Sequence, residues 1–322
     1  MQNIKKYSKL KVLTGVNLKQ FAHTFRSGAV GMSTSKFGDK WFMLPKGRAI
    51  FKNFKTNFRL YNLMTNLRMV NELLCYEIAK QLNIECAECE VATINNTRGV
   101  VSYDVAKPGE KLVQFFEISY DDVNFTALSK IIDRYILDGY KVDKNQCMKD
   151  LFTRVVFDTL TIQTDSHGNN IHFLIDEDNK TFRVAPPFDN EFGFNIANIA
   201  RIMEEKGVVS EDLLQEYLSK IYSFIHLRPK SKDQEANSFE SNLKEVIKIA
   251  KAKPEYSEIF NHMVSNFNMK DAIQKVEEKG VEIGIDYENY LLISERMIKS
   301  LIKEHSNIQV SKQEVEQEYP FL

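Results

Sequence analysis

The sequence predicts an α+β chain in two parts, a strand-rich amino-terminal lobe and a mostly helical carboxy-terminal lobe. Up to about residue 104, short strand patterns bounded by turn residues surround one main helical pattern. Beyond that point the apolar residues recur mainly at helical spacing. One polar stretch, Thr164–Asn170, is followed by a predicted hairpin inside the helical part. We therefore place the lobes at residues 1–104 and 105–322.

The composition is that of a globular chain without a charge bias. Apolar residues make up 43% of the 322 residues and charged residues 27%. The net charge of −1 gives no overall attraction to nucleic acid or to an anionic membrane. The sequence has no signal-peptide pattern and no run of about 18 apolar residues, so we expect a cytoplasmic protein without a membrane partner. We interpret Cys86 and Cys89 as small thiols rather than zinc or redox ligands.

The first clear element of the amino-terminal lobe is a loop of small and hydroxyl residues. It spans Ser27–Lys36, contains two glycines and leads into a predicted strand at Lys40–Lys46. Such a loop can bring backbone N–H groups close to a phosphate, with the hydroxyl of Ser33 and the ammonium group of Lys36 assisting. An ordinary surface turn is the alternative.

Two charged residues complete the candidate phosphate site of this lobe. Lys46 ends the predicted strand and is our candidate for the lysine that reaches the nucleotide phosphates, with Lys40 as the competitor because Pro45 disturbs the strand. Helical spacing predicts a helix over Arg68–Leu82, and Glu72 lies beside its apolar stripe, where it can pair with that lysine. An ordinary surface charge is the alternative for each residue.

A hairpin and a change of pattern end the lobe. Strands are predicted at Glu90–Ile94 and Gly99–Tyr103, on either side of two asparagines. Pro108-Gly109 then marks the change to helical spacing. We expect the backbone of Val101–Tyr103, which includes Ser102 and Tyr103, to line a hinge where a purine hydrogen-bonds to main-chain groups.

Most of the carboxy-terminal lobe is predicted to be helical. The predicted helices are 126–138, 146–162, 197–206, 210–225, 239–252, 256–268 and 285–304. Two apolar runs, Ile171–Ile175 and Thr181–Val184, flank a turn-rich connector and predict a β-hairpin. The residues 228–237 and the polar tail after Ser306 are predicted to be exposed.

The order of helix, polar loop, hairpin and second acid matches the needs of phosphoryl transfer. That reaction requires a carboxylate near the attacking hydroxyl and hard oxygen ligands for magnesium. Asp165 is the candidate for the first role. Asn170 in the same loop and Asp189 after the hairpin are the candidate metal ligands. Any one of them alone also suits an ordinary polar turn, but the ordered set indicates a phosphotransferase.

With these motifs laid out, the chain resembles the HipA-type serine/threonine kinases, a bacterial branch of the protein-kinase-like superfamily. The specific match is Thr164-Asp165-x-His167-x-x-Asn170, the hairpin and Phe188-Asp189. Looser matches are the Ser27–Lys36 loop, the Asn71-Glu72 helix and the Ser102-Tyr103 region. The resemblance extends over about residues 27–194.

The resemblance implies a two-lobed protein-kinase-like fold and transfer of the γ-phosphoryl group of Mg-ATP to a protein hydroxyl. Asp165 would be the catalytic base, Asn170 and Asp189 would bind Mg2+, and His167 would brace the catalytic loop. A serine of the family's phosphate loop can be autophosphorylated, and Ser27 or Ser33 would take that role here. The implied partners are ATP, the chain itself and a protein substrate, without direct contact to nucleic acid.

The chain departs from ordinary protein kinases at two motifs. Thr164 stands where the usual His-Arg-Asp loop has arginine, and Phe188-Asp189-Asn190 replaces Asp-Phe-Gly, so we do not expect activation-loop control of the eukaryotic type. We also do not expect the amino-terminal subdomain of the longer toxin-module members. In size the chain is similar to compact stand-alone members, which include a kinase that is translocated into host cells and acts on host proteins.

Three other functions fit parts of the same pattern. Phosphoinositide kinases carry a similar Asp-x-His-x-x-Asn loop, so a lipid or small-molecule kinase is the nearest alternative. A metal-dependent hydrolase would use Asp165, His167 and His172 as ligands. A nucleotide-binding scaffold without turnover is the third alternative.

Overall fold

Two compact units make up the chain, and each is assembled from stretches that are not adjacent in sequence. The computed structural model describes residues 40–44, 46–52, 61–94, 97–119, 121, 123–164, 170–196, 199, 210–213 and 238–318. The first unit comprises Met1–Val105, Pro187–Val208 and Asn268–Leu292, and the second comprises Ala106–Pro186, Val209–Phe267 and Ile293–Leu322. The chain thus leaves the first unit after Val105 and returns to it twice. The assignment of contiguous lobes to residues 1–104 and 105–322 stays a prediction.

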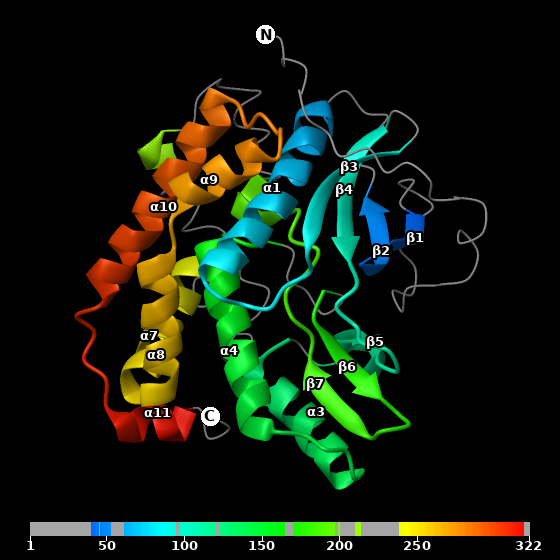
Figure 1. Ribbon diagram of the computed structural model, residues 1–322. Coiled ribbons are helices and arrows are strands. Elements are labelled where there is room, and N and C mark those ends of the chain that lie inside the picture. Colours follow the sequence, from blue (N-terminus) through cyan, green and yellow to red (C-terminus); the bar gives the residue numbers. More distant parts are fainter. Residues whose placement is uncertain are drawn as a thin grey trace. The chain divides into compact units, whose positions relative to one another are not determined.

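A four-stranded antiparallel sheet forms one layer of the first unit (Figure 1). Its strands are β1 (Lys40–Leu44), β2 (Gly47–Lys52), β3 (Cys89–Ile94) and β4 (Thr97–Tyr103), in the order β1-β2-β4-β3. The pairing of β3 with β4 confirms the predicted hairpin. The strand β2 was not predicted; it pairs with β1, with Leu44 opposite Gly47 and a turn at Lys46. Gly47 has a φ of 132°, which glycine adopts without steric cost.

The strands β2 and β4 approach closely beside Gly99. A Cβ atom at this position would lie 2.2 Å from the carbonyl oxygen of Lys52 and 2.8 Å from the ring of Phe51. The close approach of another backbone is one reason for glycine inside a strand. Gly99 therefore permits the pairing that places the end of β2 in the sheet.

The helix α1 (Tyr61–Gln81) is the main helix of the first unit and is buried on several sides. It packs on β3 and β4, on α9 (Met269–Glu278) and on η2, the 3₁₀ turn Gly193–Asn195. In Figure 1 it lies between the sheet and α9. Most of its residues from Leu67 to Ala79 are buried, including the polar Asn71, Glu72 and Glu77. Because buried polar groups require hydrogen-bond partners, these three residues indicate where the helix is fixed.

The second unit combines a three-stranded antiparallel sheet with helices. The sheet consists of β5 (Lys111–Gln114), β6 (His172–Asp176) and β7 (Thr181–Val184), in that order. The helices are α2 (Phe115–Ile118), α3 (Phe125–Leu137), α4 (Lys144–Leu160), α7 (Phe239–Ala252), α8 (Pro254–Asn266), α11 (Lys312–Glu318) and the later part of α10 (Ile285–His305). The predicted hairpin is confirmed as β6 and β7, whose Phe173 and Phe182 rings stack with centroids 5.0 Å apart.

The helix α4 forms the centre of the second unit. It packs against α3, α7, α8 and β7, and its Phe152 meets Tyr256 edge to face at 4.8 Å between ring centroids. The next residues lead towards the predicted catalytic loop. Among them Ile162 is buried and has a φ of 45°, which is strained for a β-branched residue.

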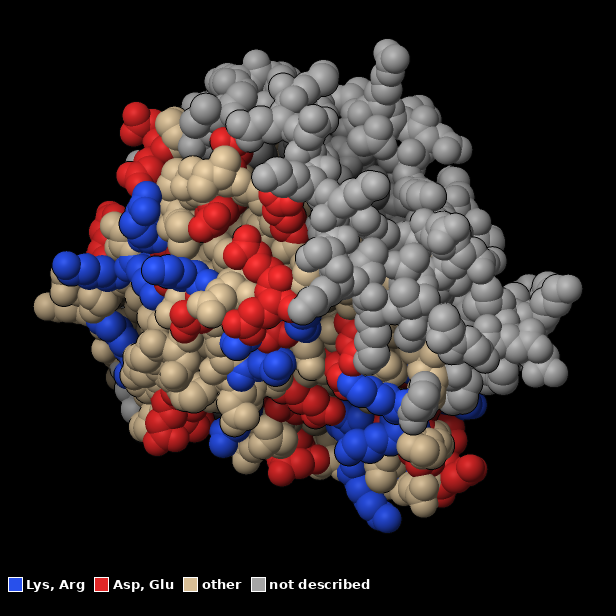
Figure 2. All heavy atoms as spheres, turned by 45° about the horizontal axis from the view of Figure 1, so that its top comes forward, with Lys and Arg blue, Asp and Glu red and all other residues tan. Residues whose placement is uncertain are grey.

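The α+β fold class is confirmed, and five of the helices predicted in the carboxy-terminal part are confirmed as α3, α4, α7, α8 and α10, with ends that differ by at most two residues. The predicted helices 197–206 and 210–225 lie largely outside the described residues. None of the helices in the described part of the chain is long and apolar enough to cross a membrane. On the face shown in Figure 2, basic and acidic side chains of the described residues are interspersed.

Candidate functional site

Lys52 joins two acidic residues that are far apart in the sequence. It is the last residue of β2, and its side chain is 9% exposed. Its Nζ atom lies 2.8 Å from Oε1 of Glu72 in α1 and 2.7 Å from Oδ1 of Asp189. All three residues belong to the first unit. The ammonium group therefore links the sheet, the main helix and the segment that starts at Pro187.

The charges of this cluster depend on one another. Burial alone would lower the pKa of Lys52, but the carboxylates of Asp189, Glu72 and Glu191 outweigh this effect and raise that pKa well above its ordinary value. The Lys52 side chain is therefore cationic at neutral pH. The Glu72 side chain is 1% exposed, so an ionised Glu72 requires this partner. The Asp189 side chain is 39% exposed and remains accessible to solvent.

Glu191 adds a third carboxyl group beside the same lysine. Burial and the neighbouring charge of Asp189 raise the pKa of Glu191 to about 7, although the cations of Lys52 and Arg68 act in the opposite direction. The Arg68 guanidinium pairs with the Glu191 carboxyl group and lies 5.0 Å from the ring centroid of Phe192. This cation–π contact adds to the link between α1 and the segment after Asp189.

The segment that carries Asp189 has an unusual backbone. The φ angles of Asp189, Phe194 and Asn195 are 59°, 54° and 50°. Aspartate and asparagine tolerate this left-handed region, whereas a bulky phenylalanine rarely adopts it. Such conformations persist where the surroundings hold them, and they cluster at functional sites. Residues 189–195, which we call the Asp189 turn, are therefore held by contacts beyond the local chain.

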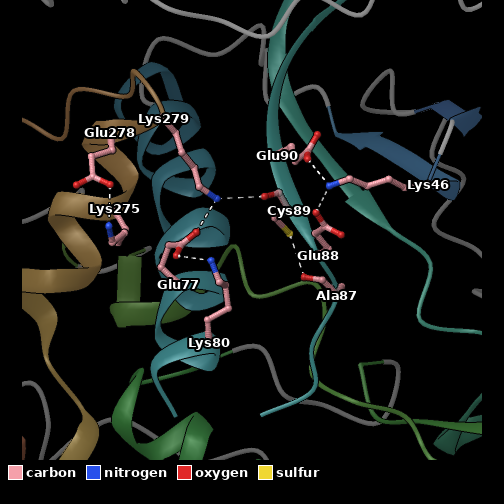
Figure 3. A network of polar contacts seen from close by, with 10 residues as sticks. All are labelled: Lys46, Glu77, Lys80, Ala87, Glu88, Cys89, Glu90, Lys275, Glu278 and Lys279. Atoms are coloured by element: carbon pink, nitrogen blue, oxygen red, sulfur yellow. Dashed lines mark hydrogen bonds and ion pairs between the residues drawn. The ribbon is translucent and has the colours of Figure 1, made fainter. Parts of the chain in front are cut away.

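Lys46, the lysine that the sequence analysis selected, makes different contacts. Its Nζ pairs with Glu88 and lies 2.7 Å from Oε1 of Glu90, as Figure 3 shows. Its side chain is 48% exposed. Glu72, which was expected to pair with Lys46 or Lys40, pairs with Lys52 instead. In the competing candidate Lys40, the backbone lies opposite Phe51, and the side chain lies outside the described part.

The predicted hinge residues lie at the end of β4. Ser102 is buried, and Tyr103 is half-buried beside Lys46, whose Nζ lies 5.5 Å from the centroid of the Tyr103 ring. The N–H of Tyr103 donates to the carbonyl of Glu88 over 2.9 Å, and the N–H of Asp104 donates to the carbonyl of Arg48 over 2.9 Å. These two donors are therefore engaged within the sheet, and the purine contact of Ser102 and Tyr103 stays a prediction.

The remaining predicted residues divide into two groups. Asn170 is described, is half-buried and directly precedes Ile171 and β6 in the second unit. The others lie outside the described residues, namely Ser27, Ser33, Lys36, Asp165 and His167. His172, the third ligand of the hydrolase alternative, is buried in β6. The predicted roles of these residues stay predictions.

The cysteines of the first unit are thiols. All four cysteines of the chain are free. Cys89 lies beside the Lys52 cluster, with Sγ 3.7 Å from Oε1 of Glu72, and burial raises its pKa well above the ordinary value. Burial also raises the pKa of Cys86 to about 12. Both thiols therefore stay protonated at neutral pH. Cys89 is buried and Cys86 is half-buried, which agrees with their interpretation as small buried or half-buried thiols.

Lys52 was not predicted as a site residue, because one strand was expected at Lys40–Lys46 where the chain forms the two strands β1 and β2. The signal was nevertheless present, since Ala49-Ile50-Phe51-Lys52 is an apolar strand segment that ends in lysine. Protein kinases place the lysine that pairs with the helix glutamate in a Val-Ala-Ile-Lys strand of the same type.

Comparison with known proteins decides the family. The model of the HipA-like C-terminal domain matches residues 43–270, which is more than half of the chain. The chain belongs to the HipA-like C-terminal domain family. The match includes Lys52, Glu72, Asn170 and Asp189, so the HipA-like part of the chain contains the described candidate residues.

Solved structures show which fold this HipA-like chain adopts. The chain is similar to the Helicobacter pylori proinflammatory kinase CtkA, with a TM-score of 0.61 and 16% identity, over 83% of this chain and 89% of that chain. The HipA of Shewanella oneidensis MR-1, solved with HipB and operator DNA, matches with a TM-score of 0.43 and 13% identity, over 82% of this chain and 61% of that chain. The likeness to CtkA confirms the kinase-like fold. No curated protein matches the sequence.

Proposed function

We propose that the chain is an ATP-dependent serine/threonine protein kinase that also phosphorylates itself. The observation that carries this proposal is the bridge that Lys52 makes between Glu72 and Asp189. Protein kinases require a strand lysine paired with a helix glutamate and a metal-binding aspartate after the catalytic loop. Membership of the HipA-like family, whose fold is kinase-like, supports the same function.

The residues fit a nucleotide bound with magnesium. The carboxylate of Asp189 and the side-chain oxygen of Asn170 are the hard oxygen ligands that Mg2+ prefers. The Lys52 ammonium group would bind phosphate oxygens, and Glu72 holds it in place before the nucleotide arrives. When bound, magnesium ATP supplies the phosphoryl group, and the metal neutralises its charge. In this proposal Lys52 takes the role that the sequence analysis gave to Lys46.

The other roles follow the resemblance to HipA-type kinases. Asp165 would accept the proton of the attacking hydroxyl, and His167 would brace the loop that carries it. Ser33 and Lys36 would act on the phosphates from the amino-terminal loop. Ser102 and Tyr103 would contact the purine. The substrate would be a protein hydroxyl, with a loop serine as the site of autophosphorylation.

Intact-mass spectrometry after incubation with magnesium ATP tests the proposal. We expect the wild type to gain phosphate and Asp165→Ala to gain none. Lys52→Met should slow phosphate gain by about 100-fold or more, since it removes a charge that contacts the transferring group. Lys46→Met decides between the two lysines, and we expect it to keep most of the wild-type rate. Lys275→Met, which changes an exposed lysine paired with Glu278, is the matched control.

Peptide mapping and substrate comparison complete this test. Phosphate within residues 27–36 would support autophosphorylation of the loop, and its absence there would contradict that part. A wild type that phosphorylates inositol lipid and no protein would favour the lipid-kinase alternative. Nucleotide binding without any turnover would favour the scaffold. Lys46→Met losing activity while Lys52→Met retains it would reverse the assignment of the lysine.

A further inference from the structure

The buried polar residues of α1 connect the helix to three other segments of the first unit. Glu72 meets Lys52 of β2. Glu77 meets Lys279, which directly follows α9, at 2.6 Å between Oε1 and Nζ, a contact drawn in Figure 3. Asn71 meets the Asp189 turn. The first two contacts are ion pairs, whereas the third depends on the orientation of a neutral amide.

Asn71 uses all the hydrogen-bonding groups of its side chain in different directions. Its Nδ2 donates to the carbonyl oxygens of Gly193 over 2.7 Å and of Glu191 over 3.3 Å. Its Oδ1 accepts a hydrogen bond from the hydroxyl of Tyr287 over 2.5 Å. Asn71 is fully buried, so each of these groups depends on its protein partner. The Asn71 amide thus connects α1 to two carbonyls of the Asp189 turn.

Tyr287 anchors the oxygen side of this amide. The two carbonyls of the turn fix which way the amide points, because they accept hydrogen bonds only and an inverted amide would place its oxygen against both of them. In this orientation Oδ1 faces Tyr287, whose hydroxyl donates to it and restrains the side chain from the opposite side. Tyr287 is buried near the start of α10, in the stretch Asn268–Leu292 of the first unit. This stretch therefore contacts α1 at Asn71 as well as at Glu77.

The Asp189 turn needs such support because its backbone is strained. Phe194, with its positive φ, is held at its carbonyl by the hydroxyl of Tyr290 over 2.6 Å. The Cys75 thiol lies 3.7 Å from the carbonyl oxygen of Asn190. Contacts from α1 and α10 thus reach several carbonyls of the turn that begins with Asp189.

We propose that Asn71 is a positioning residue that holds the Asp189 turn against α1, and that the hydrogen bond from the Tyr287 hydroxyl to Oδ1 keeps the Asn71 amide in place. The inference rests on the proposed function, because Asp189 is there the metal ligand. Asn71 immediately precedes Glu72, so the same turn of α1 sets the position of Lys52 through Glu72 and that of Asp189 through Asn71. The Lys52 ammonium group and the Asp189 carboxylate are thereby held in position relative to each other by one helix.

Tyr287→Phe tests the proposal, because it removes one hydroxyl and keeps the ring. We expect backbone amides of the peptide around residues 187–196 to exchange at least about fivefold faster, as local opening becomes easier. The kcat for phosphate transfer should fall about 10- to 100-fold, the loss expected when a reacting group is displaced by up to about 1 Å. The KM for ATP should stay within about threefold. Tyr256→Phe, which alters a buried tyrosine of the second unit, is the matched control for both measurements.

A double variant separates positioning from general packing. If the hydroxyl acts through the amide, Tyr287→Phe should add little to the effects of Asn71→Ala on exchange and on kcat. Additive effects, or unchanged exchange in Tyr287→Phe, would overturn the proposal. Normal exchange with a lowered kcat would likewise contradict the assigned mechanism. A wild type that transfers no phosphate would overturn the proposed function instead, and the exchange comparison would still decide whether Asn71 and Tyr287 hold the turn.

Discussion

A buried ammonium group beside three carboxyl groups sets the electrostatics of the candidate site. Glu72, Asp189 and Glu191 lie around Lys52, and Arg68 supplies the second cation. Three negative and two positive charges would leave an uncompensated negative charge in a poorly solvated place. The raised pKa of Glu191, about 7, follows from this excess together with its burial. Protonation of Glu191 is thus the least costly way to balance the cluster.

The titration of Glu191 predicts a pH dependence of stability. Its pKa is raised from 4.5 to about 7 on folding, so between these values the folded state binds more protons than the unfolded state. The free energy of unfolding should therefore fall as the pH rises through this window, by up to about 3 kcal/mol. Glu191→Gln cannot titrate, so urea denaturation from pH 4.5 to 7.5 should show a flatter dependence on pH for this variant.

The control for this measurement is an exposed acid of the same unit. Glu278 pairs with Lys275, and hydrogen bonds from Lys275 and Gln274 lower its pKa below 4.5. Glu278→Gln should therefore leave the pH dependence above pH 5 parallel to that of the wild type. Parallel curves for wild type and Glu191→Gln would instead mean that folding does not raise the pKa of Glu191.

The residues of the site could be predicted where local sequence defines their role. Glu72 stood out because it lies beside the apolar stripe of a predicted helix, where protein kinases carry the glutamate that pairs with a lysine, and Asp189 stood out because it follows a hairpin. Lys52 was missed because a single strand had been assumed, although the segment Ala49–Lys52 carries a local strand signal. Its position beside Glu72 could not be predicted, because it depends on pairing between β2 and β4, which joins residues about fifty positions apart.

At the scale of elements, the sheet owes its geometry near Lys52 to a glycine. The register places Lys52 opposite Val100, and the neighbouring Gly99 leaves no room for a Cβ atom. The nearest atom would be a backbone oxygen, which cannot move aside as the end of a flexible side chain can. The strand end that carries the lysine is therefore fixed by backbone contact.

Gly99→Ala should separate β2 from β4 where Lys52 sits. We expect the free energy of unfolding to fall by about 1–3 kcal/mol, the usual cost of overpacking a well-packed interior. The phosphate-transfer rate of the variant should fall even under conditions in which it is fully folded. The reason is that the Lys52 ammonium group would move relative to Glu72. Urea denaturation and the phosphate-transfer rate of the folded variant measure the two effects. An unchanged midpoint would show that the strands can separate without cost.

Elements with strong local periodicity could be predicted, and short elements that depend on distant partners could not. The helices α3 and α4 repeat apolar residues over several turns, and asparagine and aspartate cap their starts. The strand β5 has four residues and exists through its pairing with β6. The helix α9 was missed, although Asn268 caps it through the N–H of Asp271, because it follows directly on α8 and its buried face is short.

At the scale of the whole molecule, the first unit depends on chain that comes late in the sequence. Its sheet and α1 come from the first 105 residues, but the Asp189 turn and the stretch Asn268–Leu292 complete it. Two of the three buried polar residues of α1, Asn71 and Glu77, find partners in that last stretch. The unit is therefore complete only after most of the chain has been made.

A chain that ends at Phe267 should therefore lose the cooperative folding of the first unit. The truncation removes α9 with its buried apolar face and the tyrosines of α10, and each large buried apolar side chain contributes about 1.5–3 kcal/mol. A few such losses match the whole stability of a typical domain, about 5–15 kcal/mol. Asn71 and Glu77 would also lose their contacts with Tyr287 and Lys279. Hydrogen exchange of peptides from α1 measures the stability of this unit. We expect the protection of these peptides to disappear in the chain that ends at Phe267. A control chain that ends at Glu318 should keep it. If α1 stays protected in the shorter chain, the late stretch covers the helix without stabilising it, and Tyr287 cannot hold Asn71 in the way proposed.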